Sequence, residues 1–300
     1  SYEIIIGDDC SSDGSIEIIK KFSEKYPDKI RYFVMEREKN INPVPSFRVS
    51  NIFYKAFQIA NGEYIMCLSG DDYFFNKGKF QKQIDFLDNN NKYMSCYCGY
   101  KMVWDSGEER MMPQKTHLCN SLFWSGEYVH ISCFAFRKKA LKYLLNRFCD
   151  DVGLIFSILR AGKTHAMSEK MFSYRQRQGS IMNKADKLEL CIIELMLFQD
   201  VTNAGGFRLT SLSRFAKPLE YVYLNKELLA DSKYNKYIND SLKYPNDYLT
   251  FIRNNSNGIR MLIRTAKMYG LVFEKFRKLN SKLTKFVNFF NHKHTNSEHE

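Results

Sequence analysis

The chain has 300 residues, of which 44% are hydrophobic and 15% aromatic, enough to fill the core of one large or two smaller domains and to exclude a mainly disordered protein. Its formal net charge of +12 is unevenly placed, because residues 258–295 hold nine Lys or Arg against one acid, Glu274. That segment carries +8 and the rest only +4, so the charge gives no support to nucleic-acid binding by the main part of the chain.

Strands and helices alternate over the first 68 residues. Apolar runs and helical periodicity predict strands 2–6, 30–35 and 64–68, with helices between Asp13 and Pro27 and over about 46–60. This order predicts a mostly parallel sheet with right-handed crossovers. Ligands of such sheets bind beyond the carboxyl ends of the strands.

Further along, the pattern changes from mixed to helical. We expect helix 77–90, strand 93–104, a loop near 105–127, strand 130–137, and helices 138–147 and 151–161. Beyond about residue 186 we expect helices near 187–203, 213–231, 247–253 and 259–290. We therefore divide the chain into an α/β domain, residues 1–185, and a helical region, residues 186–300.

The sequence does not indicate a membrane-spanning helix or a metal site built from cysteine thiolates. No run of about eighteen apolar residues is present, and the first residues lack the features of a secretory signal. The eight cysteines are scattered without paired metal spacing. We interpret them as reduced thiols of a cytoplasmic protein.

The first acidic motif, Gly7 to Ser15, joins a strand end to a helix start. Asp8 and Asp9 at the strand end could accept the N–H of a nucleobase or ribose hydroxyls, and the helix start behind them favours phosphate. The alternative is an ordinary turn with a helix cap, for which Asp, Ser and Gly are also common.

A second motif places Asp71 and Asp72 after the strand that follows Gly62, with no Lys or Arg within four residues. Adjacent carboxylates repel each other, and a hard divalent cation that bridges to a diphosphate would remove that repulsion. A solvated acidic turn is the alternative.

A third motif places Asp150 and Asp151 before an apolar helix that ends at Gly162. Asp150 suits an N-cap and Asp151 is favourable at the positive end of the helix dipole. An exposed carboxylate at the edge of a cleft could also accept the proton of a sugar hydroxyl.

Together the three motifs resemble family 2 glycosyltransferases of the GT-A fold, in order and spacing, from residue 2 to about residue 182. The family pattern matches Ser11 to Ser15, Gly62 to Ile65, and the acidic pairs that follow. The segment Tyr174 to Ile181 is similar to the family's Tyr-Arg-x-His-x-x-Ser segment near the diphosphate. The resemblance implies a GT-A-like, Rossmann-related sheet flanked by helices, followed by the all-helical C-terminal region.

Roles for single residues follow from the resemblance. Donor-binding roles fall on Asp8, Asp9, Ser11, Asp13, Arg48, Asp71, Arg175 and Arg177. Asp71 and Asp72 would hold Mn²⁺ or Mg²⁺, and Asp151 would be the general base, with Asp150 as its neighbour. His130 would contact the acceptor. An exposed helix arginine and a structural histidine are the alternatives for Arg48 and His130.

The sequence departs from the family pattern at three points. Ser69 stands where the family often has Asp, and Arg177 stands where it often has His. The family's first strand and nucleotide-binding loop would precede Ser1 by roughly thirty residues, so we expect the chain to lack that first strand.

The function expected from the resemblance is inverting transfer of a sugar, from a nucleotide sugar such as a UDP-sugar, to a glycan or lipid-linked acceptor. The alternatives are a binding scaffold without turnover and a nucleotidyltransferase, although a Gly-rich or Lys-rich triphosphate loop is not found. The basic segment 259–290 is expected either to bind an anionic membrane surface at the inner face of the cytoplasmic membrane or to pack on the protein. Sugar, linkage and oligomeric state stay open.

Overall fold

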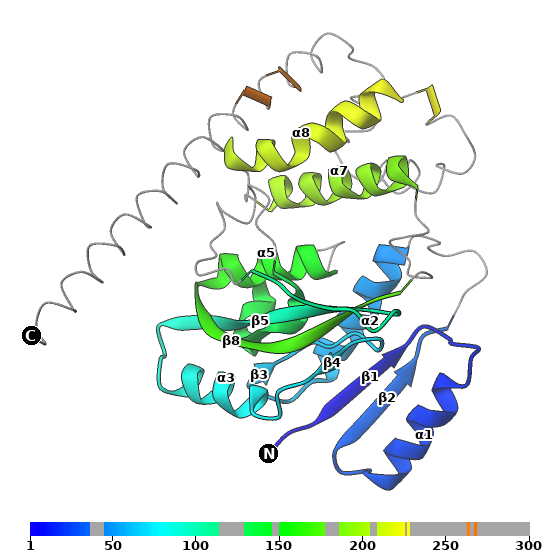
Figure 1. Cartoon of the computed structure of the whole chain (residues 1–300), viewed down its shortest axis with the longest axis vertical. Helices are drawn as coiled ribbons and strands as arrows, with labels where there is room; N and C mark the ends of the chain where they lie inside the picture. Colours follow the sequence, from blue (N-terminus) through cyan, green and yellow to red (C-terminus); the bar gives the residue numbers. More distant parts are fainter. Residues whose placement is uncertain are drawn as a thin grey trace, which may run out of the picture.

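The protein has an α/β fold with a small N-terminal sheet and a larger mixed sheet, both flanked by helices (Figure 1). The computed structural model describes residues 1–36, 45–113, 129–145, 150–177, 186–204 and 209–225, with the short pieces 227–228, 263–264 and 267–268.

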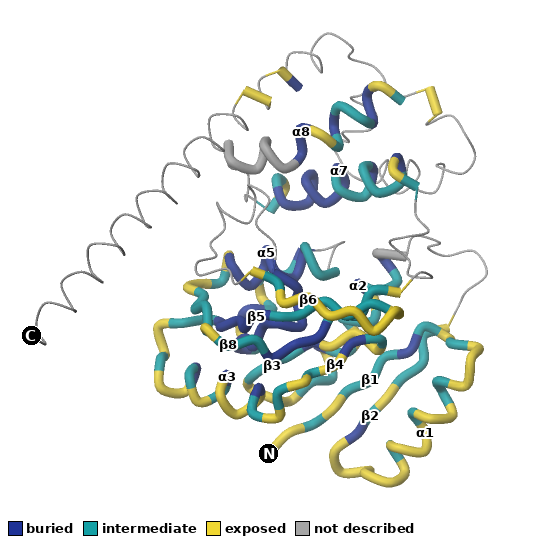
Figure 2. The backbone as a smooth tube through the Cα atoms, in the orientation of Figure 1, coloured by how far each residue is buried: buried dark blue, intermediate teal, exposed yellow. Residues whose placement is uncertain are grey.

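The N-terminal unit contains the parallel strands β1 (Ile4–Asp8) and β2 (Ile30–Val34), connected by helix α1 (Ser15–Lys25). These elements confirm the predicted order. Strand β1, however, begins and ends later in the sequence than the predicted strand 2–6, and it includes Asp8 itself. The apolar face expected for α1 is only partly covered, and Ile18 and Phe22 are exposed (Figure 2). A sheet of only two strands, spaced about 4.8 Å apart, is too narrow to bury a whole face of a helix.

Six strands form the larger sheet: β3 (Tyr64–Ile65), β4 (Tyr73–Phe74), β5 (Tyr93–Trp104), β6 (Glu109–Met111), β7 (Phe134–Arg137) and β8 (Lys163–Gln176). The order is β3-β7-β5-β8-β4, and β6 pairs with β5. In the described part of this sheet β5–β8 is the parallel pair, whereas the other pairs are antiparallel.

The prediction of a mostly parallel sheet is therefore confirmed only in part, because β1–β2 and β5–β8 are parallel whereas the other described strand pairs are antiparallel. β7 runs between β3 and β5 in the opposite direction, and β4 joins β8 in the same way. The direction of each strand depends on which strands become its neighbours in the sheet, and the local pattern of hydrophobic residues does not indicate that pairing. Strand β8 itself was not predicted. The strand expected at 64–68 is shorter in the structure, where β3 contains only Tyr64 and Ile65.

The two faces of the larger sheet carry different helices, because successive strand residues point to opposite sides. Helix α3 (Lys79–Asp88) covers one face, where its Leu87 packs with Cys96 and Ala135. Tyr97 and Phe134 point to the other face and share the main core with helix α5 (Asp151–Ala161). Figure 1 shows α3 and α5 on either side of β5 and β8.

Short 3-10 turns replace part of the structure expected between the loop and α5. η1 (Ile131–Cys133) precedes β7, and η2 (Lys138–Tyr143) stands where a helix 138–147 was predicted. Helix α2 (Pro45–Ile59) confirms the helix predicted at 46–60 and packs on β1.

Helices α7 (Lys187–Asn203) and α8 (Leu209–Leu224) lie beyond α5 and pack on each other, with the rings of Phe198 and Phe215 stacked at 4.2 Å. Their buried side chains belong to the same core as α5. The helix predicted at 187–203 is confirmed, and that at 213–231 begins earlier. The segments 247–253 and 259–290 lie outside the described residues, except for Ile263, Arg264, Lys267 and Met268.

No helix in the described ranges is both long enough and apolar enough to cross a membrane. The domain boundary near residue 185 stays a prediction.

Candidate active site

The second acidic motif is fixed against strand β8. Asp71 and Asp72 lie in the turn before β4, which pairs with β8. The backbone N–H of Arg175 on β8 donates to Asp72 Oδ1 at 2.8 Å, and the Arg175 side chain donates through Nε to the carbonyl of Asp71. Arg175 thus holds the acidic turn in place.

His130 connects this turn to the third motif. Its Nε2 atom lies 3.6 Å from Asp151 Oδ2 and 3.9 Å from Asp72 Oδ2. Asp151 opens helix α5, while Asp150 caps it by accepting the N–H of Gly153 at 3.0 Å. The two acids of the third motif therefore have different surroundings: Asp150 serves the helix end and Asp151 faces the histidine.

Burial shifts the pKa values of Asp72 and His130. Burial, with the negative charges of Asp71 and Asp151 adding to it, raises the pKa of Asp72 to about 6, although the N–H of Arg175 opposes the shift. Burial also lowers the pKa of His130 to about 4, so the imidazole is neutral near pH 7. The site therefore combines a neutral ring with carboxylates.

The surroundings of Asp71 and Asp72 fit a divalent cation. Asp72 Oδ2 is buried and has no hydrogen-bond partner among the described atoms. Hard cations such as Mn²⁺ and Mg²⁺ prefer carboxylate oxygen, and a cation here would compensate the buried charge. Over the residues described, no group of three or more His, Cys, Asp or Glu side chains is arranged for a metal, so Asp71 and Asp72 would leave positions open to phosphate and water.

The first motif forms a second set of contacts. Asp8 is buried and accepts from the backbone N–H and the hydroxyl of Ser11, both at 2.7 Å. Arg48 Nε of α2 lies 3.2 Å from Asp9 Oδ2, an ion pair whose N–H is not aligned as a hydrogen bond. Asp13 accepts the backbone N–H of Ser15 at 3.1 Å at the start of α1.

Gly7 explains why α2 can approach β1 so closely. A Cβ atom at this position would lie 2.5 Å from Ile52 on α2 and 2.7 Å from Phe33 on β2. Such distances are well below van der Waals contact, so only glycine fits without a shift of the neighbours. The close packing brings Arg48 next to Asp9.

Five of the predicted residues are thus linked by direct contacts: Asp71, Asp72, Arg175, His130 and Asp151. In the first motif, Asp8 contacts Ser11, and the adjacent Asp9 forms a separate pair with Arg48. Arg177 follows β8 and is exposed.

Two aromatic residues of the site were missed. The ring of His130 stacks on Phe172 at 4.9 Å and lies against Tyr174 at 4.6 Å. Both belong to β8. Tyr174 lies in the Tyr-Arg segment and could have been found there, whereas Phe172 carries no local signal.

The first half of the chain matches a known family. Residues 1–145 match the family described as glycosyl transferase family 2. An uncharacterised protein of Mycobacterium tuberculosis is 30% identical over 105 residues, which are 35% of this chain and 28% of that protein. TuaG of Bacillus subtilis, a putative teichuronic acid biosynthesis glycosyltransferase, is 29% identical over 106 residues, which are 35% of this chain and 38% of that protein. The matches therefore span well under half the length of these relatives.

The fold is also similar to that of a solved structure. The crystal structure of S. aureus TarS 1-349 superposes with a TM-score of 0.52 and 15% identity, over 92% of this chain and 82% of that chain. At this identity the likeness concerns the fold alone.

Proposed function

We propose that the protein transfers a sugar from a nucleotide sugar, with UDP as the nucleotide, to a hydroxyl of a glycan or lipid-linked acceptor, because residues 1–145 match glycosyl transferase family 2. The observation that carries this proposal is the meeting of Asp72 and Asp151 at one buried histidine. A cation-binding acid and a candidate base are thus brought close together although 79 positions separate them.

Two regions would bind the donor. Asp9 accepts the N–H of the nucleobase, with Arg48 and Asp8 beside it and with Ser11 and Asp13 completing the turn. Arg175 and Arg177, at the end of β8, lie toward the diphosphate. This assignment is supported by the ion pair of Asp9 with Arg48 and by the contact of Arg175 with Asp71.

Asp71 and Asp72 would hold Mn²⁺ or Mg²⁺. When bound, the cation supplies positive charge for the departing nucleoside diphosphate. The buried, unpartnered Oδ2 of Asp72 supports this assignment.

Asp151 acts as the general base. Its carboxylate accepts the proton of the acceptor hydroxyl while the hydroxyl oxygen bonds to the anomeric carbon. The bond from that carbon to the phosphate oxygen breaks in the same displacement, and the configuration inverts. Asp151 suits this role because it lies at the start of α5 and Asp150 already supplies the cap.

Calorimetry with UDP and a screen of nucleotide sugars test the proposal. We expect UDP to bind in Mn²⁺ and to bind much more weakly in chelator, and one nucleotide sugar to be hydrolysed or transferred. Asp72→Ala should lose the effect of Mn²⁺, whereas Asp85→Ala, at an exposed position on α3, should keep it. Equal affinity in chelator would remove the metal role, and absence of any turnover would favour a binding scaffold.

A further inference from the structure

The imidazole ring of His130 has a fixed orientation. Nδ1 accepts the backbone N–H of Ser132 at 3.2 Å, and the ring is held by Phe172 and Tyr174. Only 5% of the residue is exposed. Since Nδ1 is already an acceptor, the neutral ring carries its proton on Nε2.

The Nε2–H group therefore faces carboxylates from two different elements. Asp151 comes from the start of α5 and Asp72 from the turn before β4, at 3.6 and 3.9 Å. A shift of about 0.5 Å by either side chain would turn the contact with Asp151 into a hydrogen bond. The opposite tautomer would instead point a lone pair at two negative charges.

This geometry excludes His130 as the base, because the lone pair that could accept a proton is occupied by Ser132. It leaves the ring as a fixed donor between two acids that repel each other. Asp72 and Asp151 interact unfavourably, and without a donor between them the Asp151 carboxylate, which is 31% exposed, would turn away from the buried Asp72.

We propose that His130 is a positioning residue whose Nε2–H holds the Asp151 carboxylate in the orientation that accepts the acceptor proton and keeps it apart from Asp72. The inference rests on the proposed function, in which Asp151 is the base. Orientation matters at such a position because a misplacement of about 1 Å can cost on the order of 10²-fold in rate.

Two variants separate this role from the structural one. His130→Asn places an amide oxygen near the position of Nδ1, so it keeps the cap on Ser132, but it is too short to reach Asp151. His130→Gln places an amide N–H near the position of Nε2, so it keeps the donor but loses the cap.

The kinetic test uses the full chain and the nucleotide sugar that the screen identifies. We expect His130→Asn to keep its melting temperature and its donor KM while kcat falls roughly 10- to 100-fold. His130→Gln should melt lower and yet retain kcat within about fivefold. A purely structural histidine gives the reverse order, with the less stable Gln variant the poorer enzyme, and that order would overturn the inference.

A second measurement does not depend on turnover. In protein labelled with ¹⁵N-histidine, the NMR signals of His130, identified by their loss in His130→Asn, should report a proton on Nε2 and should shift in Asp151→Asn. A proton on Nδ1, or signals insensitive to Asp151, would refute the positioning role. If wild-type protein turns over no nucleotide sugar, the proposed function fails, and this spectrum still decides whether His130 holds Asp151.

Discussion

The side chain of Asp72 is 1% exposed, and its Oδ2 atom has no hydrogen-bond partner among the described atoms. Its folded-state pKa is raised from 3.8 to about 6, mainly by burial. The folded protein therefore binds this proton more tightly than the unfolded chain, and ionisation of Asp72 destabilises the folded state. The cost is fully present above pH 6 and disappears as the pH falls toward 3.8.

Replacement of this charge should therefore stabilise the protein when no cation is bound. In chelator at pH 7 we expect Asp72→Asn to raise the free energy of unfolding by about 1–3 kcal/mol, because the amide can still accept the N–H of Arg175. Urea unfolding at pH 7 and pH 4.5 measures this, and the advantage should shrink at the lower pH. Asp85→Asn is the exposed control. A less stable Asp72→Asn protein at pH 7 would contradict the prediction.

Asp151 and Asp150 provide a matched pair of neighbours with different contacts. Asp151→Asn keeps the shape of the side chain but cannot take the acceptor proton, so kcat should fall roughly 10²- to 10⁴-fold while UDP affinity stays near that of wild type. Asp150→Asn should keep kcat, because Asn caps a helix as well as Asp does. Kinetics and calorimetry on both variants check this. Loss of turnover in Asp150→Asn alone would transfer the base to that residue.

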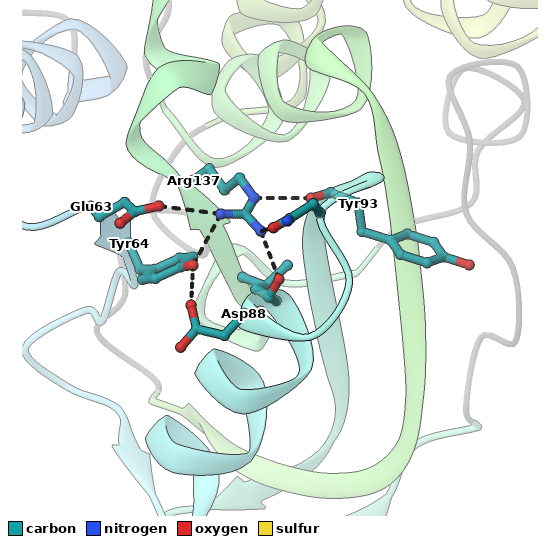
Figure 3. A network of polar contacts seen from close by, with 7 residues as sticks. Glu63, Tyr64, Asp88, Tyr93 and Arg137 are labelled. Atoms are coloured by element: carbon teal, nitrogen blue, oxygen red, sulfur yellow. Dashed lines mark hydrogen bonds and ion pairs between the residues drawn. The ribbon is translucent and has the colours of Figure 1, made fainter.

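At the level of elements, Arg137 connects β7 to the start of β3 and to the end of α3 (Figure 3). Its guanidinium donates to the carbonyls of Leu87 and Tyr93 at 2.6 and 3.2 Å, to Tyr64 Oη at 3.0 Å and to Glu63 at 3.3 Å. The side chain is 7% exposed, whereas Glu63 is 74% exposed. The hydrogen bonds to buried backbone therefore contribute more than the ion pair.

Arg137→Met should lower the free energy of unfolding by about 2–4 kcal/mol, because the apolar chain fills similar space but leaves the carbonyls without this donor. Denaturant unfolding gives the value. Lys82→Met is the control: it removes an ion pair with Glu169 that is exposed on both sides, and should change stability by less than about 0.5 kcal/mol. Equal effects of the two substitutions would show that the Arg137 contacts add little.

The elements that sequence predicts well are those with local signals at both ends. Helix α5 was predicted to the residue, since Asp150 caps it and Gly162 follows it. Strand β8 was not, because its three buried residues, Met171 to Ser173, are consecutive and do not alternate. It is a strand because β5 and β4 pair with it on either side.

The same difference applies to the candidate site. Asp71, Asp72 and Asp151 could be found from acidic pairs at strand and helix ends. The direction of the His130 ring could not be predicted, because it depends on Phe172 and Tyr174 of β8 and on the turn η1. Whether the sheet is parallel or mixed was likewise decided by contacts between distant segments.

On the scale of the whole molecule, two of the four described residues of the basic segment contact the folded part. Ile263 is buried in the main core, and Lys267 Nζ lies 2.5 Å from Glu220 on α8. At Ile263 and Lys267 the segment 259–290 therefore packs on the protein, which was one of the two alternatives. The membrane alternative applies to residues beyond this contact. There the basic residues outnumber Glu274 and the last two glutamates; they are Lys275, Arg277, Lys278, Lys282, Lys285 and Lys293.

We predict that residues 271–300 attach the protein to anionic membranes without contributing to its folded core. Phe273, Phe276 and Leu279 alternate with basic residues at helical spacing, and basic residues near an anionic surface contribute about 1 kcal/mol each at low salt. The intact protein should therefore sediment with phosphatidylserine vesicles at low salt and much less at high salt. Deletion of 271–300 should abolish sedimentation and leave the melting temperature unchanged, because Ile263 and Lys267 remain.

Replacement of Lys275, Arg277 and Lys278 by Gln should weaken sedimentation. Replacement of Lys20 and Lys21, which are exposed on α1, is the control. Sedimentation unaffected by the deletion, or a large fall in melting temperature, would show that the segment packs on the protein throughout, and an acceptor in the membrane would lose this support.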